Sequence, residues 1–426
     1  MRNGDPTTAM PAASRPGPGP AVVPPGGTLG ILGGGQLGRM TALAARQMGY
    51  RVVTLDPAPD APCAQVADQA VVAALDDVDA ARRLAALADV VTYEFENVAA
   101  AVAQALEEAA TVRPASGVLA AAQDRVREKR TFAALGLPVA AFRPVASRAE
   151  LEEAAAAVGY PCLLKTATGG YDGKGQYWIR TPADLQPVWS QAAGGTDVPG
   201  AAGERVGPAQ RFILEARVPF RKELSVIVAR NPQGQTAVFP PAENVHRRQI
   251  LHVSIVPARV PEAVAAAAKQ LAVQLAEGLD AVGVLGVELF LDGDDRLYVN
   301  EFAPRPHNSG HYTIEACVTS QFQQHVRSVC GLPLGSTALL RPAVMVNLLG
   351  QHMAAMRANL GALLAIDGLH LHVYGKREAR RDRKMGHVTV LADTLDEALA
   401  RAQRAWDLVR APDDPSGLLD PASDSS

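Results

Sequence analysis

Several features that would indicate other classes of protein are scarce in this 426-residue sequence. The four cysteines form no Cys-x-x-Cys pair and lie in apolar segments, so they predict reduced core thiols in the cytoplasm rather than disulfides or a zinc site. There is no run of about eighteen apolar residues, which excludes a membrane-spanning helix. The 41 lysines and arginines do not outnumber the 44 acidic residues, so no basic excess points to nucleic acid. We expect a cytoplasmic protein that binds neither membrane nor nucleic acid.

Three stretches lack the apolar periodicity of folded segments. Residues 1–27 are rich in Pro, Gly and Ala, which predicts a disordered leader rather than a secretory signal. Residues 412–426 are predicted to form a disordered tail, and residues 192–210 an extended surface loop. The length of the whole chain suggests about three domains, and its hydrophobic content of 48% is typical of a globular enzyme.

The stretch from Lys165 to Gln176, Lys-Thr-Ala-Thr-Gly-Gly-Tyr-Asp-Gly-Lys-Gly-Gln, indicates a polyphosphate site. Apolar segments precede and follow it, which predicts a β-hairpin with a glycine-rich tip. Because glycine has no Cβ, backbone N–H groups at the tip can approach phosphate oxygens closely, while Lys165 and Lys174 supply positive charge. A Walker loop would instead continue into a helix and end in Gly-Lys-Ser/Thr. We interpret the stretch as a nucleotide-binding hairpin.

A second glycine-rich turn, Gly33 to Gly38, links a predicted strand at 28–32 to a predicted helix at 39–48. It matches the pattern Gly-x-Gly-x-x-Gly, and Asp56 ends the next predicted strand, where an acid would bind a ribose. An NAD-dependent dehydrogenase is therefore one interpretation, and a phosphate at any helix N-terminus is another. Because the hairpin described above suits a polyphosphate better, we assign this turn to the phosphate of a second substrate.

The segments on either side of the turn 292–295 predict another β-hairpin, which carries two acids, Glu288 and Glu301. If Leu291 faces Arg296, the two acids lie on one face as diagonal neighbours, roughly 7 to 8 Å apart at Cα. Two carboxylates in an otherwise apolar sheet repel one another unless a cation bridges them. Exposed acids beside water are the alternative, but the apolar neighbours disfavour a wet face. The hairpin therefore predicts a magnesium site.

Basic residues follow this hairpin at two places. Arg305 and His307 come one strand end later, where an arginine could neutralise an acyl phosphate and a histidine could carry protons near neutral pH. The cluster at 376–387 would, by itself, be interpreted as a solvated loop or a nucleic-acid patch. Glu215 and Glu223, taken by themselves, would be interpreted as surface strand acids.

Four motifs occur in the order found in the ATP-grasp superfamily and, within it, in the 5-(carboxyamino)imidazole ribonucleotide synthase family, which the chain resembles from about residue 28 to residue 410. The motifs lie at Gly34 to Met40, Gly169 to Gln176, Asn300 to His311 and Arg383 to His387. The resemblance implies a mixed α/β and α+β fold, the ATP-grasp fold. Its predicted parts are an N-terminal Rossmann-like (pre-ATP-grasp) domain at 28–118, a lid subdomain at 119–218, a large subdomain at 219–340 and a small C-terminal closing domain at 341–411.

The same resemblance implies an ATP-dependent carbon–nitrogen ligase of purine biosynthesis, which carboxylates 5-aminoimidazole ribonucleotide with bicarbonate. It implies ATP with Mg2+ or Mn2+ as cofactors, and a homodimer. Nucleotide binding is assigned to Arg125, Lys165, Gly170, Tyr171, Asp172, Gly173, Lys174, Gly175, Gln176, Glu215, Val218, Glu223, His246 and Asn300. Binding of the ribonucleotide is assigned to Gly35, Gln36, Leu37, Glu94, Asn308, Lys376, Arg383 and Lys384. Catalysis is assigned to Tyr171, Asp172, Arg305, His307 and Lys384, and the metal to Glu288 and Glu301.

The chain departs from this family in one motif and from a rival family in three. Residues 380–382 are Arg-Arg-Asp where the family usually has Arg-Pro-Gly, which leaves the shape of that loop open. The rival is formate-dependent glycinamide ribonucleotide transformylase, which has Glu where this chain has Gln36, serine-rich residues where it has Tyr171-Asp172, and Asp where it has Asn308. An ammonium substrate favours an acid, whereas a neutral aromatic amine suits an amide. These residues favour the carboxylating family.

Overall fold

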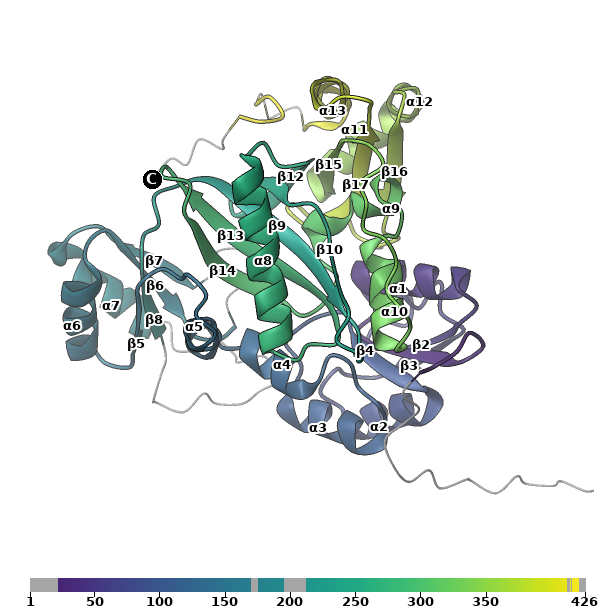
Figure 1. The fold of residues 1–426 in the computed structure, drawn as a ribbon, viewed down its shortest axis with the longest axis horizontal. Coiled ribbons are helices and arrows are strands. Elements are labelled where there is room, and N and C mark those ends of the chain that lie inside the picture. The colour runs from purple at the N-terminus through teal and green to yellow at the C-terminus, as the bar shows by residue number, and fades with distance from the viewer. Residues whose placement is uncertain (1–21, 170–174, 195–211, 412–413, 415, 421–426) are drawn as a thin grey trace, which may run out of the picture.

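The computed structural model describes residues 22–169, 175–194, 212–411, 414 and 416–420. The described residues form three sheets of four, four and nine strands. In Figure 1 the nine-stranded sheet occupies the centre, with one small sheet at the left and the other at the lower right. The parts of the predicted leader, loop and tail that fall at 1–21, 195–211, 412–413, 415 and 421–426 lie outside the described residues.

The N-terminal part is a parallel sheet with strand order β3-β2-β1-β4. Its strands are β1 (Thr28–Leu32), β2 (Arg51–Asp56), β3 (Gln69–Val72) and β4 (Val90–Tyr93). Its helices are α1 (Gln36–Gln47), α2 (Val78–Leu87), α3 (Ala100–Ala109) and α4 (Ser116–Ala122). The first two strands have the predicted bounds, and α1 begins three residues earlier than predicted. Val23 is only 2% exposed and its N–H donates to the Cys330 carbonyl at 2.9 Å, so the packed structure begins before the predicted boundary at 28.

The lid is an antiparallel sheet with order β5-β8-β6-β7, packed against helices. Its strands are β5 (Phe142–Val145), β6 (Cys162–Thr166), β7 (Gln176–Ile179) and β8 (Phe212–Ala216), and its helices are α5 (Arg125–Ala134), α6 (Arg148–Val158), η1 (Pro182–Asp184) and α7 (Leu185–Gly194). Lys165 pairs with Gln176, so β6 and β7 form the predicted hairpin. Its tip, Gly170 to Lys174, lies outside the described residues.

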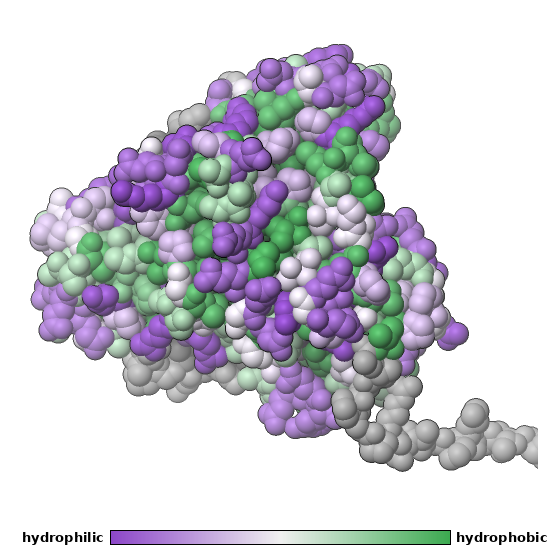
Figure 2. Space-filling model, in the orientation of Figure 1, coloured by the Kyte–Doolittle hydropathy of each residue, from purple (hydrophilic) through white to green (hydrophobic). Residues whose placement is uncertain are grey.

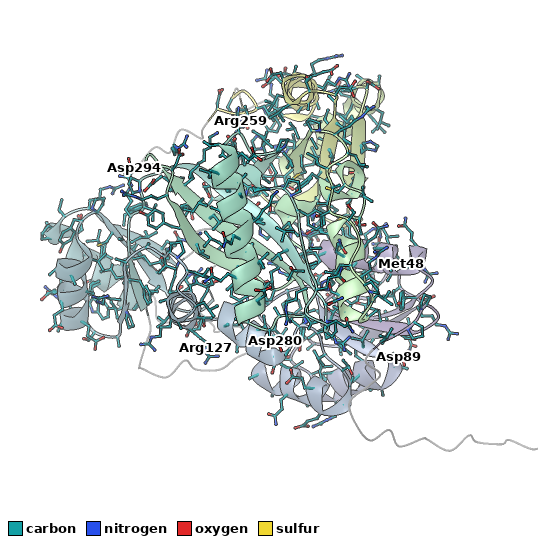
Figure 3. The ribbon with its side chains drawn as sticks, viewed as in Figure 1. Met48, Asp89, Arg127, Arg259, Asp280 and Asp294 are labelled. Carbon is teal, nitrogen blue, oxygen red and sulfur yellow. The ribbon has the colours of Figure 1, made fainter. Side chains whose placement is uncertain are left out.

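The central sheet has the order β14-β13-β9-β11-β12-β15-β17-β16, with β10 paired to β9. Its first strands are β9 (Phe220–Arg230), β10 (Thr236–Val238), β11 (Ala242–Arg247), β12 (Ile250–Val256), β13 (Gly283–Asp292) and β14 (Leu297–Ala303). The long helix α8 (Glu262–Gly278) covers one face, between Arg259 and Asp280 in Figure 3. Val226 and Val228 pack in the core cluster beneath α8, while Ile227 packs in the cluster of Tyr312, because alternate residues of a strand point to opposite faces.

Within the described residues, the three C-terminal strands extend this sheet instead of forming a separate one, and the remaining C-terminal elements are helices. The C-terminal elements are η2 (Asn308–Gly310), α9 (Thr313–Ala316), α10 (Gln321–Val329), β15 (Ala343–Leu349), η3 (Gly350–His352), α11 (Met353–Ala358), α12 (Leu360–Leu364), β16 (Leu369–Val373), β17 (Lys384–Leu391) and α13 (Leu395–Val409). Strand β15 pairs with β12, with Val346 opposite Val253. The predicted boundary at 340/341 therefore divides one sheet, which a reading of local periodicity could not detect.

Residues 416–420 pack on α13, although they were predicted to be a disordered tail. Leu418 is 1% exposed, and its N–H donates to Gln403 Oε1 at 2.9 Å. Trp406 Nε1 donates to the Ser416 carbonyl at 2.9 Å. These contacts show that the expectation of disorder is wrong for this segment, because tertiary packing and a buried tryptophan compensate for its polar composition.

The cysteines, the helices and the surface can also be described from the structure. All four cysteines are buried and free, as predicted. Among the described residues, no helix is both long and apolar enough to cross a membrane. Hydrophilic and hydrophobic side chains are interspersed over the face shown in Figure 2.

We predict that Leu418→Ala lowers the free energy of unfolding by about 2 to 4 kcal/mol, because the substitution leaves a cavity beside α13. Urea denaturation followed by tryptophan fluorescence would measure the change. The matched control is Leu364→Ala, since Leu364 is 53% exposed and its truncation should cost less than about 0.5 kcal/mol. Equal effects of the two substitutions would show that the tail segment does not contribute to the core.

Candidate active site

A cleft of about 1540 Å3 gathers most of the predicted site residues from all parts of the fold. The predicted residues that line it are Gln36, Leu37, Glu94, Arg125, Lys165, Gln176, Glu215, Val218, Glu223, His246, Glu288, Asn300, Glu301, Arg305, His307, Asn308 and Lys384. Those that do not line it are Gly35, Gly175, Lys376 and Arg383. Those that lie outside the described residues are Gly170, Tyr171, Asp172, Gly173 and Lys174. This gathering of residues agrees with the general rule that ligands of open α/β sheets bind at the carboxyl ends of the strands.

The two acids of the β13–β14 hairpin face one another more directly than predicted. Glu288 pairs directly with Glu301, because the pairing shifts by one residue between Glu288 and Leu289. The predicted diagonal relation was wrong for two reasons: Leu291 pairs with Leu297 rather than with Arg296, and strand β14 holds Asn300 as an extra residue at a β-bulge, which periodicity alone does not reveal. Glu301 is exposed to the cleft, so on β14 the face is not dry as the apolar neighbours predicted. Desolvation by the surrounding cleft walls still raises the pKa of Glu301, and the negative charge of Glu288 raises it further. The pair thus has the unfavourable like-charge contact that a cation would relieve.

These acids fit a magnesium ion that shares its ligands with a phosphate. Among the described residues, no group of three or more His, Cys, Asp or Glu side chains could hold a metal by itself. Magnesium commonly binds one or two carboxylates together with substrate phosphate oxygens and water. The cations Arg125, Lys165 and Lys129 act to lower the pKa of Glu301, whereas His307, His246 and Lys384 act to lower the pKa of Glu288. The donor set therefore suits a metal bound between two substrates.

His307 stands beside Glu288 and is held at both ring nitrogens. Its Nε2 lies 3.1 Å from Glu288 Oε1, and its Nδ1 lies 2.8 Å from Ser309 Oγ. Burial acts to raise the pKa of Glu288, but the hydrogen bond and charge of His307 outweigh it, and the pKa lies at about 2. Gly286 makes room for the ring, since a Cβ there would lie 2.5 Å from the Cβ of His307. The arrangement places an imidazole next to the paired acids.

The lid side of the cleft has the chemistry of a nucleotide site. Lys165 Nζ lies 3.0 Å from Glu215 Oε2, and Lys129 Nζ lies 3.7 Å from the same oxygen. Burial opposes ionisation of Glu215, but the charges of Lys129 and Lys165 prevail, and its pKa lies at about 2. Glu223 and His246 pair at 3.0 Å. This pairing outweighs the effect of burial and raises the pKa of His246.

Aromatic residues that the sequence did not single out also line the cleft. Phe220 and Phe290 stack with ring centroids 4.5 Å apart and an angle of 8° between the rings. Phe290 is directly opposite Glu223 across β13 and β9. Such a pair offers an apolar wall beside Glu223. The alternation of the strands could have suggested it, because Phe290 and Glu288 share one face.

The glycine-rich turn of the N-terminal part is occupied by two carboxylates. Gly38 N–H donates to Glu94 Oε2 at 2.6 Å, and Gly34 N–H donates to Asp56 Oδ2 at 2.8 Å. A Cβ at Gly35 would lie 2.1 Å from Glu94 Oε1, so a side chain there would displace the Glu94 carboxylate. Burial raises the pKa of Glu94 to about 7 in spite of the opposing bonds from the turn. Any phosphate at these N–H groups would have to displace both acids, which weighs against the dehydrogenase alternative and equally against the predicted binding of a second substrate's phosphate at this turn.

Arg305 is fixed by an acid of the N-terminal part that the sequence analysis had not assigned a role. Its Nη2 donates to Glu96 Oε1 at 3.0 Å, and its Nε donates to Glu96 Oε2. The two-point geometry of the guanidinium–carboxylate pair orients the arginine. Burial acts to raise the pKa of Glu96, but Arg305 outweighs it and the pKa is lowered.

The basic loop before β17, residues 376–383, forms a hydrogen bond with the backbone of Lys384. Lys376 Nζ donates to the Lys384 carbonyl at 2.7 Å, and burial, followed by the charge of Arg383, lowers the pKa of Lys376 to about 8. Asp382 has a φ of 62°, and the N–H of Arg383 donates to the Arg380 carbonyl at 3.1 Å. A turn with positive φ at its third residue usually has glycine there, and aspartate tolerates the conformation better than most residues. The Arg-Arg-Asp sequence can therefore form the turn that Arg-Pro-Gly would form.

Comparison with known proteins decides the family. Three family models match: a ribonucleotide synthetase preATP-grasp domain at 27–123, an ATP-grasp domain at 130–322 and a phosphoribosylaminoimidazole carboxylase C-terminal domain at 343–401. An N5-carboxyaminoimidazole ribonucleotide synthase of Bacillus subtilis is 44% identical over 385 residues, covering 90% of this chain and 97% of the relative. The chain belongs to the N5-carboxyaminoimidazole ribonucleotide synthase family. The predicted family, ATP-grasp fold and ligase class are confirmed.

Solved structures of this family share the whole architecture. An ADP complex of an N5-carboxyaminoimidazole ribonucleotide synthetase is 49% identical, with a TM-score of 0.84, and the match covers 91% of this chain and 99% of that one. A complex from Staphylococcus aureus with ADP is 39% identical with a TM-score of 0.82, covering 91% and 98% of the two chains. A synthase of Aspergillus clavatus in complex with ADP and 5-aminoimidazole ribonucleotide is 32% identical with a TM-score of 0.78, covering 90% and 98%. The family therefore binds an adenine nucleotide.

We predict that the loop of Asp382 depends on both its conformation and its side chain: Asp382 Oδ1 accepts a hydrogen bond from Gln351 Nε2 at 3.0 Å, and the Asp382 backbone N–H donates to Gln351 Oε1 at 2.9 Å. Asp382→Ala should lower the free energy of unfolding by about 1 to 2 kcal/mol more than Asp382→Gly, because alanine is strained at positive φ. Asp382→Asn, which tolerates positive φ and keeps an acceptor, should stay within about 0.5 kcal/mol of the parent. Urea denaturation would measure all three, and equal stability of the Ala and Gly variants would contradict the role of the turn.

Proposed function

We propose that the protein uses ATP to carboxylate 5-aminoimidazole ribonucleotide with bicarbonate, releasing ADP and phosphate. One observation supports the proposal most strongly: a single cleft is lined by the ion pair of Lys165 and Glu215, by the opposed acids Glu288 and Glu301, and by His307 and Lys384. The relatives add support, because a family member has been solved with both ADP and 5-aminoimidazole ribonucleotide.

In this proposal the reaction has two steps. An oxygen of bicarbonate attacks the γ-phosphorus of ATP, the bond to ADP breaks, and carboxyphosphate forms. The exocyclic nitrogen of the ribonucleotide then bonds to the carboxyl carbon, phosphate leaves with the bonding electron pair, and the nitrogen loses a proton. Lys165 offsets phosphoryl charge on the nucleotide side, and Arg305 offsets the charge of the acyl phosphate. His307, between Glu288 and Ser309, holds the proton.

Glu288 and Glu301 would hold Mg2+, which neutralises and orients the phosphoryl oxygens when it is bound. Two finer points stay predictions because they follow only from the resemblance: Mn2+ in place of Mg2+, and a homodimer, which sedimentation velocity would check.

Asn308 favours an amine of neutral charge over the ammonium of the rival transformylase reaction. Its side chain is 9% exposed, it lines the cleft, and neither its Oδ1 nor its Nδ2 makes a hydrogen bond to the described residues. A buried amide without partners is costly, so a bound group is expected to satisfy it. An amide can both donate to and accept from a neutral substrate, whereas an ammonium would be better served by an acid.

The test measures ADP release with each acid and each ribonucleotide. We expect release with bicarbonate and 5-aminoimidazole ribonucleotide together, and a rate lower by more than about a hundredfold with formate and glycinamide ribonucleotide, equivalent to about 2.8 kcal/mol of transition-state discrimination. N5-carboxyaminoimidazole ribonucleotide should appear in equal amount with ADP. Release that depends on formate would overturn the proposal in favour of the transformylase.

The paired acids give a separate prediction. Glu301→Gln should lower the rate of ADP release by at least about a hundredfold at a fixed free Mg2+ concentration, because it removes a charged ligand of the metal. Glu277→Gln is a matched control, since Glu277 is an exposed acid at the end of α8 and should leave the rate unchanged. Near-parental turnover of Glu301→Gln at limiting Mg2+ would rule out the metal assignment.

A further inference from the structure

Two consecutive charged residues of α5, Glu128 and Lys129, are buried although no described substrate-binding role uses them. They are 3% and 2% exposed. Helix α5 also buries the apolar residues Val126 and Phe132 in the core, whereas Glu128 and Lys129 border the cleft. Apolar side chains of similar size would fill such positions without the cost of removing two ionisable groups from water. The positions of their polar atoms indicate what the two side chains contribute.

Both side chains bind the backbone of β14 on either side of Glu301. Glu128 Oε1 accepts the N–H of Phe302 at 2.9 Å, and Lys129 Nζ donates to the carbonyl of Asn300 at 2.5 Å. Strand β14 is the last strand of the central sheet, so its outer edge has no neighbouring strand within the described sheet to satisfy these groups. The two residues of α5 therefore complete the hydrogen bonding of an edge strand with an acid and a base.

The hydrogen bonds of Glu128 and Lys129 lie at a β-bulge next to Glu301. The pairing of β13 and β14 is shifted next to Glu288, so Asn300 is the extra residue of the bulge and Glu301 follows it directly. A bulge interrupts the regular ladder and re-aims the side chains beside it. The backbone torsions at Glu301 decide where its carboxylate points, and they are set by the two peptide groups that α5 holds. The bonds thus fix the geometry of Glu301 opposite Glu288.

Lys129 also connects this hairpin to the lid. Its Nζ lies 3.7 Å from Glu215 Oε2, the oxygen that Lys165 contacts at 3.0 Å. One ammonium group is thus shared between the backbone of the metal hairpin and the acid on the nucleotide side of the cleft. A substitution of Lys129 should therefore affect both the β13–β14 hairpin and Glu215.

We propose that Glu128 and Lys129 are positioning residues that hold the β14 bulge so that Glu301 is oriented for the metal. The inference rests on the metal role of Glu301 given under Proposed function. Neither residue touches a substrate in this account. Each acts through the backbone of β14, in the way that outer hydrogen bonds orient the direct ligands of other metal sites.

The experiment follows the Mg2+ requirement of ADP binding, which is independent of turnover. The ADP-induced rise in melting temperature is measured over a range of free Mg2+ concentrations for the full-length protein. Four variants are compared. Glu128→Met removes the acceptor, Glu128→Gln keeps an oxygen that accepts the Phe302 N–H, Lys129→Met removes the donor, and Phe132→Leu loosens the same helix without removing either bond. Phe132 packs against Phe302 with ring centroids 5.9 Å apart, which makes it a close structural control.

We expect Glu128→Met and Lys129→Met to raise the Mg2+ concentration at half-maximal effect by about tenfold or more, and Glu128→Gln to restore it to within about threefold of the parent. Phe132→Leu should lower the melting temperature without changing the Mg2+ requirement. The proposal is overturned if Phe132→Leu shifts the requirement as much as the two Met variants, or if Glu128→Gln fails to rescue. Should Glu128→Met not fold, Lys129→Met with the same control decides the question.

Glu301→Gln, measured alongside, separates this inference from the proposed function. If Glu301→Gln shifts the Mg2+ requirement and Glu128→Met and Lys129→Met do not, the positioning role is wrong and the metal assignment stands. If Glu301→Gln leaves the requirement unchanged, the metal assignment itself is wrong, and the inference fails with it.

Discussion

The arrangement of the site depends on a repulsion, the contact between Glu288 and Glu301 on neighbouring strands. Two carboxylates opposite one another in a largely apolar sheet are unfavourable in the protein alone. The surrounding groups are arranged around this charge: His307 binds Glu288, and the cations Arg125 and Lys165 act on Glu301. A metal bound with a phosphate would complete the compensation. The protein without ligands therefore retains a repulsion between Glu288 and Glu301 that a bound cation would relieve. This relief would favour binding of the cation at the paired acids.

Long-range contacts hold this arrangement in place. Arg305 is oriented by Glu96 from the N-terminal part, 209 positions earlier in the chain. Glu301 is flanked by bonds from α5, and Glu215 of the lid is shared by two lysines. Each part of the fold thus contributes a charge to the cleft. No single part contains a complete set, so the cleft exists only when the three sheets pack together.

The structure also changes the meaning of the glycine-rich turn at Gly33 to Gly38. Its glycines matched a dinucleotide pattern, but the N–H groups of Gly34 and Gly38 are bound by Asp56 and Glu94. The close approach that glycine permits is used here by carboxylates of the protein. A pattern of glycines indicates that another group approaches the backbone closely. The surrounding residues decide whether that group is a ligand phosphate or a carboxylate of the protein.

The sequence by itself determined the family, the strands and helices with clear periodicity, and the residue types of the site. The motifs at Asn300 to His311 and Arg383 to His387 carried this information, because they hold side chains whose chemistry is independent of their exact placement. Tertiary structure decided the rest. It inserted the bulge at Asn300, joined the C-terminal strands to the central sheet through β12 and β15, and brought residues 416–420 onto α13. It also brought Glu96, Glu128 and Lys129 into hydrogen bonds with Arg305 and strand β14, which the sequence alone does not indicate. The physical reason is that register, edge-strand hydrogen bonding and buried ion pairs depend on partners far away in the chain, and local residue preferences contain no information about those partners.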